Sequence, residues 1–167
     1  MKILTLLFVA TMLFSCAPES DTKLSEQQKK KIQEEIQPVI MKLYDAAAHA
    51  DTTKLYDLIS FKDDFTYIEI TGEFYDEATY KQMAGQWFNM INSELIKKGS
   101  EKYNYINENN VVWSYSGALT ATYKNGRQEK YNPFGMTLIL KKINNQWKVT
   151  FIQESTQQPV EDTTKHS

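Results

Sequence analysis

The order of two hydrophobic periodicities is the feature that most constrains the fold of this chain. Before Gly99, apolar residues recur at steps of three and four, the helical period. After Gly99 they alternate with polar residues, the strand period, and Asn125-Gly126 is a strong signal for a two-residue hairpin. Since no helical segment separates the last strands, they predict a curved antiparallel sheet with the helices on one face. This is an α+β fold and not a doubly wound one.

The half of the chain before Gly99 predicts three helices and two short strands. In order, these are a helix over about 26–50, a short helix over 53–59, strands over 65–70 and 74–75, and a helix over about 77–98. Pro38 should kink or split the first helix. Asp51 is a good N-cap for the second, and Gly99 suits a left-handed exit from the third.

The half after Gly99 predicts four strands. Tyr103 and Tyr105 mark the first, and the other three cover about 111–123, 135–143 and 146–154. One face of the long second strand is apolar and carries Val111, Trp113, Tyr115, Leu119, Ala121 and Tyr123. Asn144-Asn145 turns the third strand into the last.

Composition excludes several classes of function. The chain has 167 residues, enough for one domain, with 19 basic and 21 acidic residues, so nucleic acid is not an expected partner. A single cysteine excludes an intrachain disulfide, and with two histidines no cluster has metal-ligand spacing. The six glycines are scattered at turns and form no phosphate-binding loop. We therefore expect neither a metal nor a cofactor.

The first sixteen residues predict export. Lys2 precedes an apolar run of about a dozen residues, too short to span a bilayer, which ends in Leu13-Phe14-Ser15-Cys16. This ending resembles the lipobox of bacterial lipoproteins, which implies that Cys16 is lipidated and anchors the protein to a membrane. Ala17, where an aspartate would favour retention at the inner membrane, implies the outer membrane, facing the periplasm. The alternatives are a plain signal peptide and a short buried helix with an incidental cysteine.

Four segments follow from this pattern. Residues 1–15 are the predicted lipoprotein signal peptide, 16–24 a tether, 25–155 a single domain, and 156–167 a polar, disordered tail. No internal repeat divides the domain.

The domain resembles the nuclear transport factor 2-like superfamily, in its polyketide-cyclase-like (SnoaL-like) branch. The resemblance covers about residues 28–155 and rests on the segment LYDAAAHAD, the Asp63-Asp64 strand entry, and the ending NQWKV followed by Ser155. It implies a cone-shaped α+β barrel, in which long helices close a strongly bent sheet around a pocket at the wide end. Members include isomerases, cyclases, dehydratases and noncatalytic binding domains, so the fold alone does not decide activity.

Glu69 is the candidate general base that the resemblance implies. It shares a strand face with Phe65 and Tyr67, and an apolar, aromatic surrounding raises a carboxyl pKa. The alternatives are that this face points outward or that Glu69 pairs with a cross-strand lysine. At the position of the family's enolate-binding tyrosine the chain has Leu43, with Tyr44 one residue away, a rotation of about 100° on a helix. His49 is a favourable charge at a helix C-terminus rather than a catalyst.

Aromatic residues are the candidate lining of a pocket. Most aromatic side chains belong to the core, and those at the wide end would border a small, partly apolar or aromatic ligand. The candidates are Tyr44, Tyr67, Trp87, Tyr105, Trp113 and Tyr115.

Three functions remain open. The first is a lipid-anchored domain that binds a small molecule or a partner, without catalysis. The second is an isomerase or dehydratase-like enzyme with Glu69 as base, which an enclosed Glu69 near a donor such as Tyr44 or Tyr105 would favour. The third is a noncatalytic homodimeric interaction module, which a filled cone and an exposed apolar sheet face would favour.

Overall fold

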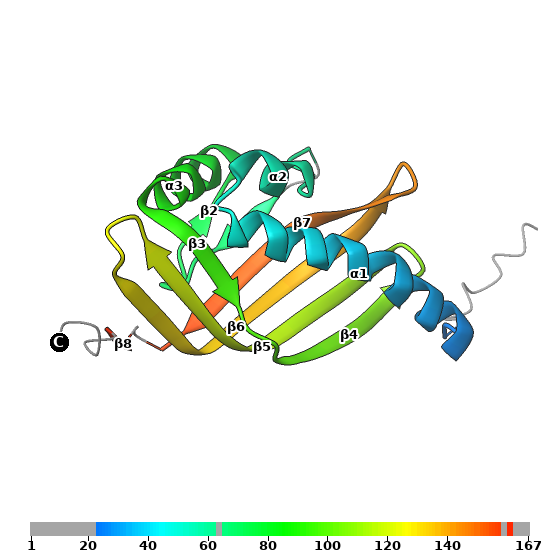
Figure 1. Ribbon diagram of the computed structural model, residues 1–167. Helices are drawn as coiled ribbons and strands as arrows, with labels where there is room; N and C mark the ends of the chain where they lie inside the picture. The colour runs from blue at the N-terminus through cyan, green and yellow to red at the C-terminus, as the bar shows by residue number, and fades with distance from the viewer. Residues whose placement is uncertain (1–22, 63–64, 158–159, 162–167) are drawn as a thin grey trace, which may run out of the picture.

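The computed structural model describes residues 23–62, 65–157 and 160–161. Cys16, the predicted signal peptide and most of the predicted tether lie outside the described residues, as do Asp63 and Asp64. Within the described part, the helices and the sheet form two layers, and all three helices lie on the same side of the sheet (Figure 1). The predicted α+β architecture is confirmed.

Three helices form the upper layer in Figure 1: α1 (Glu26–Ala48), α2 (Thr52–Asp57) and α3 (Glu77–Met90). Ser25 opens α1 with a capping box, in which its hydroxyl accepts from the Gln28 backbone and the Gln28 side chain accepts from the Ser25 backbone. The predicted split at Pro38 is wrong, because α1 runs through it. Buried isoleucines on both sides, Ile36 and Ile40, are each 0% exposed, and their packing outweighs the loss of one helical hydrogen bond.

Eight strands form one sheet. They are β1 (Thr66–Ile68), β2 (Phe74–Tyr75), β3 (Ile91–Ile96), β4 (Ser100–Asn107), β5 (Asn110–Tyr123), β6 (Gln128–Ile143), β7 (Gln146–Thr156) and β8 (Val160–Glu161). The order is β2-β1-β7-β6-β5-β3, with β4 also paired to β5 and β8 to β6. The sheet is mixed rather than wholly antiparallel as predicted, because β1 pairs with β7 in parallel. The chain passes through α3 and five further strands between these two, so they need no tight turn.

The predicted third helix ends at Met90, eight residues early, and this part of the prediction is wrong. Residues 91–96 instead form β3, which pairs antiparallel with β5 from Ile91 opposite Tyr123 to Ile96 opposite Leu119. Ile91 and Leu95 fit a helical stripe by spacing, but in the strand Ile91 is 1% exposed and Leu95 55% exposed. Pairing with a distant strand overrides the local helical period here.

Gly99 also has a different role from the predicted helix exit. Its backbone lies against β5 at Tyr115, Ser116 and Gly117, where the ladders of β5 show an irregularity between Gly117 and Leu119. The Tyr115 hydroxyl lies at this irregularity and donates a hydrogen bond to the backbone oxygen of Lys97 at 2.6 Å. A side chain at position 99 would therefore collide with backbone.

Both C-terminal hairpins turn where predicted, but the turn at Asn125-Gly126 is one residue longer than the predicted two-residue turn. The Tyr123 backbone N–H donates to the Arg127 oxygen, so three residues lie in that loop. Gly126 has φ of +87°, and Asn144 and Asn145 have φ of +48° and +63°, values that Gly and Asn adopt more readily than other residues. β7 reaches Thr156, and residues 160–161 pair with 129–130 of β6, so part of the segment predicted as a disordered tail is paired to the sheet. The predicted apolar face of β5 is confirmed, with Trp113 at 0% exposure in the centre of the core.

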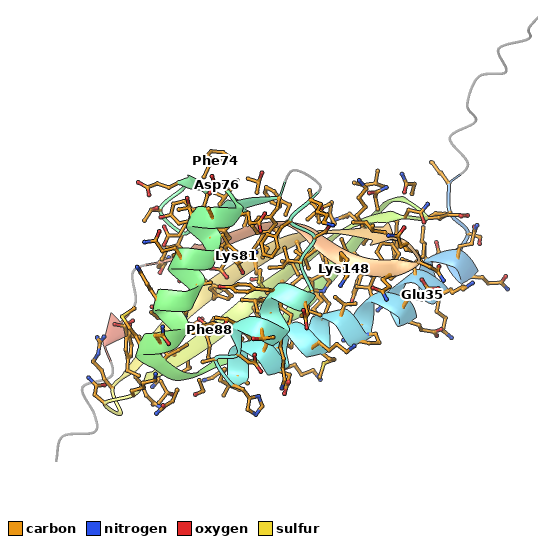
Figure 2. All side chains as sticks on the ribbon, turned by 90° about the horizontal axis from the view of Figure 1, so that it is seen from above. Glu35, Phe74, Asp76, Lys81, Phe88 and Lys148 are labelled. Carbon is orange, nitrogen blue, oxygen red and sulfur yellow. The ribbon has the colours of Figure 1, made fainter. Side chains whose placement is uncertain are left out.

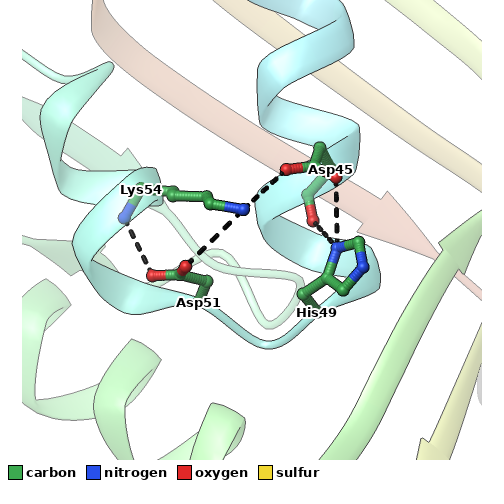
Figure 3. Close-up of polar contacts among 4 residues, drawn as sticks. All are labelled: Asp45, His49, Asp51 and Lys54. Atoms are coloured by element: carbon green, nitrogen blue, oxygen red, sulfur yellow. Dashed lines mark hydrogen bonds and ion pairs between the residues drawn. The ribbon is translucent and has the colours of Figure 1, made fainter.

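The junction of α1 and α2 is held by a small polar cluster at the surface (Figure 3). The carboxylate of Asp51, the predicted N-cap, accepts from the Lys54 backbone at 3.0 Å. The Lys54 ammonium donates to Asp45 at 3.0 Å, and His49 lies 3.1 Å from the other oxygen of Asp45. This ammonium holds the pKa of Asp45 below its usual value. His49 thus caps the end of α1, and these contacts give it a structural role.

A second polar contact joins α1 to the sheet at the opposite end of the molecule from Phe74 and α3 (Figure 2). Glu35 accepts from the Lys142 ammonium at 2.6 Å and from the Trp147 indole at 2.9 Å. These contacts join α1 to the hairpin of β6 and β7.

Gly99→Ala and Gly85→Ala are a matched pair that tests the close approach at position 99. Gly85 lies inside α3 with only the Tyr56 hydroxyl, at 4.0 Å, near an added methyl group, so alanine there should stabilise the fold by about 0.5–1 kcal/mol. At position 99 the methyl group would lie 2.8 Å from Tyr115 and 3.0 Å from Gly117, besides striking the Ser116 oxygen, and we expect a loss of about 1–3 kcal/mol. Urea unfolding of both variants measures the difference. Equal stabilities would contradict the packing described here.

Candidate functional site

A cavity of about 330 Å³ lies between the helices and the sheet at the α3 end of the molecule. Its size is at the lower limit for sites that bind small molecules. Most of its wall is apolar and comes from all three helices and from β3, β5, β6 and β7: Leu43, Ala47, Leu55, Ile70, Met83, Ala84, Phe88, Met90, Ile96, Leu119, Phe134, Met136 and Ile152. Its polar groups are few: Tyr67, Glu69, Tyr80, Gln86, Trp87, Glu94, Tyr131 and Glu154.

Glu94 on β3 enters the cavity because the chain changes from helix to strand at Ile91. Its Oε1 accepts a hydrogen bond from the Trp87 indole Nε1 at 3.0 Å, across the junction of α3 and β3. Burial of the carboxyl and the negative charge of Glu154 raise the pKa of Glu94 to about 8, and the Trp87 hydrogen bond opposes this shift. Near neutral pH the empty cavity therefore holds Glu94 largely protonated.

Glu154 is the second enclosed carboxyl. It lies two residues after the buried Ile152 on β7, and residues two apart share one face of a strand, so it faces the helices. Tyr67 on β1 donates to its Oε2 at 2.8 Å. Burial and then the charge of Glu69 raise the pKa of Glu154, whereas the Tyr67 hydrogen bond lowers it. Both acids are thus held in a surrounding that disfavours their ionisation.

Two tyrosines complete the polar part of the wall. Tyr80 on α3 is 5% exposed, and its hydroxyl has no hydrogen-bond partner among residues 23–62 and 65–157. Tyr131 on β6 donates to Glu129 at 2.8 Å and closes one side of the wall. Burial raises the pKa of both phenols, so both remain protonated donors.

The structure brings three of the predicted site residues to the cavity: Tyr67, Glu69 and Trp87. Glu69, the candidate base, follows the end of β1 and is half-buried. One of its oxygens accepts from the Thr71 backbone at 2.9 Å and from the Thr71 hydroxyl at 2.5 Å. Its partners are therefore a local turn rather than a lysine on a neighbouring strand.

The other predicted lining residues lie elsewhere, and the cavity wall does not include Tyr44, Tyr105, Trp113 or Tyr115. Tyr44 packs edge-on against the rings of Trp113 and Tyr115, each at 6.4 Å between centroids, in the core beneath α1. Tyr105 stacks on Tyr103 toward the other end of the sheet, at 6.4 Å. Trp113 and Tyr115 are therefore buried core, and Tyr44 and Tyr105 are half-buried and pack against that core rather than at the cavity.

Sequence reasoning missed Glu94, Glu154, Tyr80 and Tyr131. Glu94 was hidden in the segment predicted as helix, where its direction could not be deduced. Glu154 was missed because strict alternation from Trp147 and Val149 would point Gln153 inward instead. A register shift in the pairing of β6 with β7, between Ile139 and Leu140, reverses the alternation, so Ile152 and Glu154 face inward.

No group of three or more His, Cys, Asp or Glu side chains among residues 23–62 and 65–157 is arranged to hold a metal ion. No helix in these segments is long and apolar enough to cross a bilayer.

The fold has known relatives. Residues 36–161 match the model of a family described as the SnoaL-like domain. A hexachlorocyclohexane dehydrochlorinase from Novosphingobium barchaimii superposes with a TM-score of 0.66 at 9% identity, over 86% of this chain and 98% of that one. A nuclear transport factor 2-like superfamily protein from Salmonella enterica gives 0.63 at 17%, over 83% and 99%. A nuclear transport factor 2-like protein of unknown function from Prochlorococcus gives 0.57 at 24%, over 81% and 95%.

The structural similarity to these proteins establishes the cone-shaped fold, but at these sequence identities it does not establish an activity. No curated protein matches the chain.

The raised carboxyl pKa values predict an unusual dependence of stability on pH. A glutamate with an unfolded pKa near 4.5 and a folded pKa of about 8 binds more protons in the folded state between these values. Its contribution is therefore fully present at low pH and is lost as pH rises toward about 8. Glu94→Gln removes this titration while keeping a neutral acceptor for Trp87. The wild type should lose stability relative to this variant by up to about 1.4 kcal/mol per pH unit between about pH 5 and 8.

Urea unfolding of the two proteins across this range measures the difference. The exposed Glu34→Gln variant is the control and should run parallel to the wild type. Parallel curves for wild type and Glu94→Gln would show that Glu94 is not held protonated.

Proposed function

Because the chain belongs to the SnoaL-like domain family, of the nuclear transport factor 2-like fold, we propose that its cavity binds a small, largely apolar molecule with a polar end. The supporting observation is the pair Glu94 and Glu154, two carboxyls held under helices in an apolar hollow. Burying acids costs stability, and a region that served only packing would be filled more stably by apolar side chains. Perturbed acids in a cavity are typical of functional sites.

The shape of the cavity supports the same proposal. Its wall is built by rigid elements, and polar groups converge on it from α3, β1, β3 and β7. Ligand sites in proteins combine an apolar wall with a few oriented polar groups in this way. A purely structural interaction module would be favoured by a filled cone, whereas a cavity lies beside α3.

An isomerase or dehydratase-like activity with Glu69 as base is the alternative. Glu69 borders the cavity, but its hydrogen bonds go to Thr71, and the two donors expected beside it, Tyr44 and Tyr105, are absent from the wall. The dehydrochlorinase shares the fold but is only 9% identical to this chain, so its activity does not carry over. Binding is therefore the function that the geometry supports better.

Filling the cavity tests this proposal. Ala84 on α3 is 5% exposed and borders the cavity, so Ala84→Phe should occupy the space of the ligand. Hits from a fragment library, found by ligand-observed NMR on the wild type, should lose at least about tenfold in affinity. Ala78→Phe is the matched control, because Ala78 is exposed on the same helix, and it should bind like the wild type. Hits that bind all three proteins equally would contradict the cavity as the site.

We also propose that the protein is attached to a membrane through Cys16, at the outer membrane and facing the periplasm. The support is the sequence alone: a short apolar run that ends in Leu13, Ser15 and the single cysteine. Acyl chains contribute about 0.8 kcal/mol per buried CH₂ and hold an otherwise water-exposed domain at the bilayer.

Labelling with a fatty acid measures this attachment in a bacterial host that processes lipoproteins. Cys16→Ser should abolish the label and release the protein from the membrane fraction. Ser15→Ala keeps a small residue before the cysteine and should be labelled normally. Membrane retention of Cys16→Ser equal to that of the wild type would exclude the anchor.

A further inference from the structure

The cavity wall is unbalanced in charge. Three carboxyl groups border it, those of Glu69, Glu94 and Glu154, and none of the described residues that line it is Lys, Arg or His. A carboxylate ligand would give up its hydration in this enclosed space and find no cationic side chain in the wall to pair with, which is unfavourable. The wall therefore selects against anions and leaves cations and neutral molecules.

The acids have unused acceptors. The Trp87 bond uses one oxygen of Glu94, and the Tyr67 bond uses one oxygen of Glu154. Within the described part of the chain, Tyr44 has the only fully covered side-chain oxygen or nitrogen without a hydrogen bond. The second oxygens of both glutamates and the hydroxyl of Tyr80 are thus unpartnered but not fully covered. Since Tyr80 is only 5% exposed, its hydroxyl is a buried polar group that an occupant of the cavity can reach.

Besides its aliphatic side chains, the cavity wall contains aromatic rings near these acids. Tyr67 and Tyr80 lie 5.1 Å apart between ring centroids, and Trp87 contacts Glu94 directly. Rings of this kind attract a cation through their faces, and the attraction is stronger where water is excluded. Proteins recognise alkylated ammonium groups by two components, carboxyl groups that supply negative charge and aromatic rings that surround the cation.

We propose that the ligand of this cavity is a small organic cation, an amine or alkylated ammonium compound, whose charge lies between Glu94 and Glu154 and whose alkyl groups contact the aromatic wall. This proposal rests on the proposed function and names the ligand class of the same site. A neutral molecule would leave both acids protonated, so it would gain no ion pair with them.

Cation binding is coupled to a proton. Several groups from other elements face Glu94: Glu154 on β7, Tyr80 and Trp87 on α3, and Tyr131 on β6. None of these carries a positive charge. A bound cation would therefore favour the ionised form of Glu94 and lower its pKa from about 8. Below about pH 8 the complex then releases a proton, and affinity rises up to tenfold for each pH unit.

Choline and 3,3-dimethylbutan-1-ol are the probes for this proposal, because they have nearly the same shape and differ in the charge of one atom. Choline keeps its charge at every pH, so any pH dependence belongs to the protein. Isothermal titration calorimetry and ligand-observed NMR at about pH 6 and about pH 8.5 should show that choline binds at least about tenfold more tightly than the alcohol at the higher pH. Its affinity should fall toward the lower pH, whereas that of the alcohol should stay constant.

Glu94→Gln separates the charge from the shape of the site. It should bind the two probes with similar affinity and lose the pH dependence, while Glu34→Gln, on the exposed face of α1, should behave like the wild type. Glu94→Gln has a neutral side chain of the same size, and its thermal unfolding transition shows that it is folded.

The outcomes separate this proposal from the proposed function. If the alcohol binds as well as choline at both pH values, and Ala84→Phe abolishes its binding, the cavity is a ligand site but the ligand is not a cation. If choline binds more tightly but Ala84→Phe leaves its affinity unchanged, the cation lies elsewhere on the protein. Binding of neither probe at millimolar concentration contradicts the cation proposal, and the fragment test with Ala84→Phe then decides the proposed function alone.

Discussion

The antiparallel pairing of β3 with β5 is the interaction on which the site depends. It ends α3 at Met90, converts residues 91–96 into a strand, and turns Glu94 toward the hollow under the helix. A helix continued to residue 98 would have filled this space with its own turns. The register also buries Ile91 at 1% exposure opposite Tyr123, so the same backbone hydrogen bonds fix the end of the core and the position of one acid.

The helix layer and the sheet are joined by polar and aromatic contacts at one end of the molecule and leave a cavity between them at the other. At one end, Glu35 joins α1 to Lys142 and Trp147, and the rings of Tyr44, Trp113 and Tyr115 fill the space between α1 and the sheet. At the other end, Tyr80, Ala84 and Phe88 of α3 are buried, and a cavity of about 330 Å³ is left open beside them. The acids within this space are disfavoured as ions by burial. They can be kept only at a cost in stability, which the proposed ligand would offset.

The fold was largely predictable from the sequence, because helical stripes and alternating patterns distinguish most helices from most strands and the turns carry Asn and Gly. The start of α2 agrees with the predicted N-cap Asp51, and the positions of the turns at 125–126 and 144–145 follow from local chemistry. The candidate site was predicted less well. INSELI fits a helical stripe as well as a strand, and only its distant partner β5 decides between them. Tyr67 and Trp87 were expected at the cavity and border it, whereas Trp113 and Tyr115 are core, because the position of the hollow depends on how far the sheet bends.

The protonation of the two enclosed glutamates is the most direct test of this account. Side-chain carboxyl carbons of Glu94 and Glu154 can be followed by NMR as the pH of the unliganded protein is raised, with assignments from Glu94→Gln and Glu154→Gln. The account predicts that Glu94 titrates near pH 8 and that Glu154 titrates above the ordinary value of 4.5. Titration of both carboxyls near 4.5, as for exposed glutamates, would contradict it.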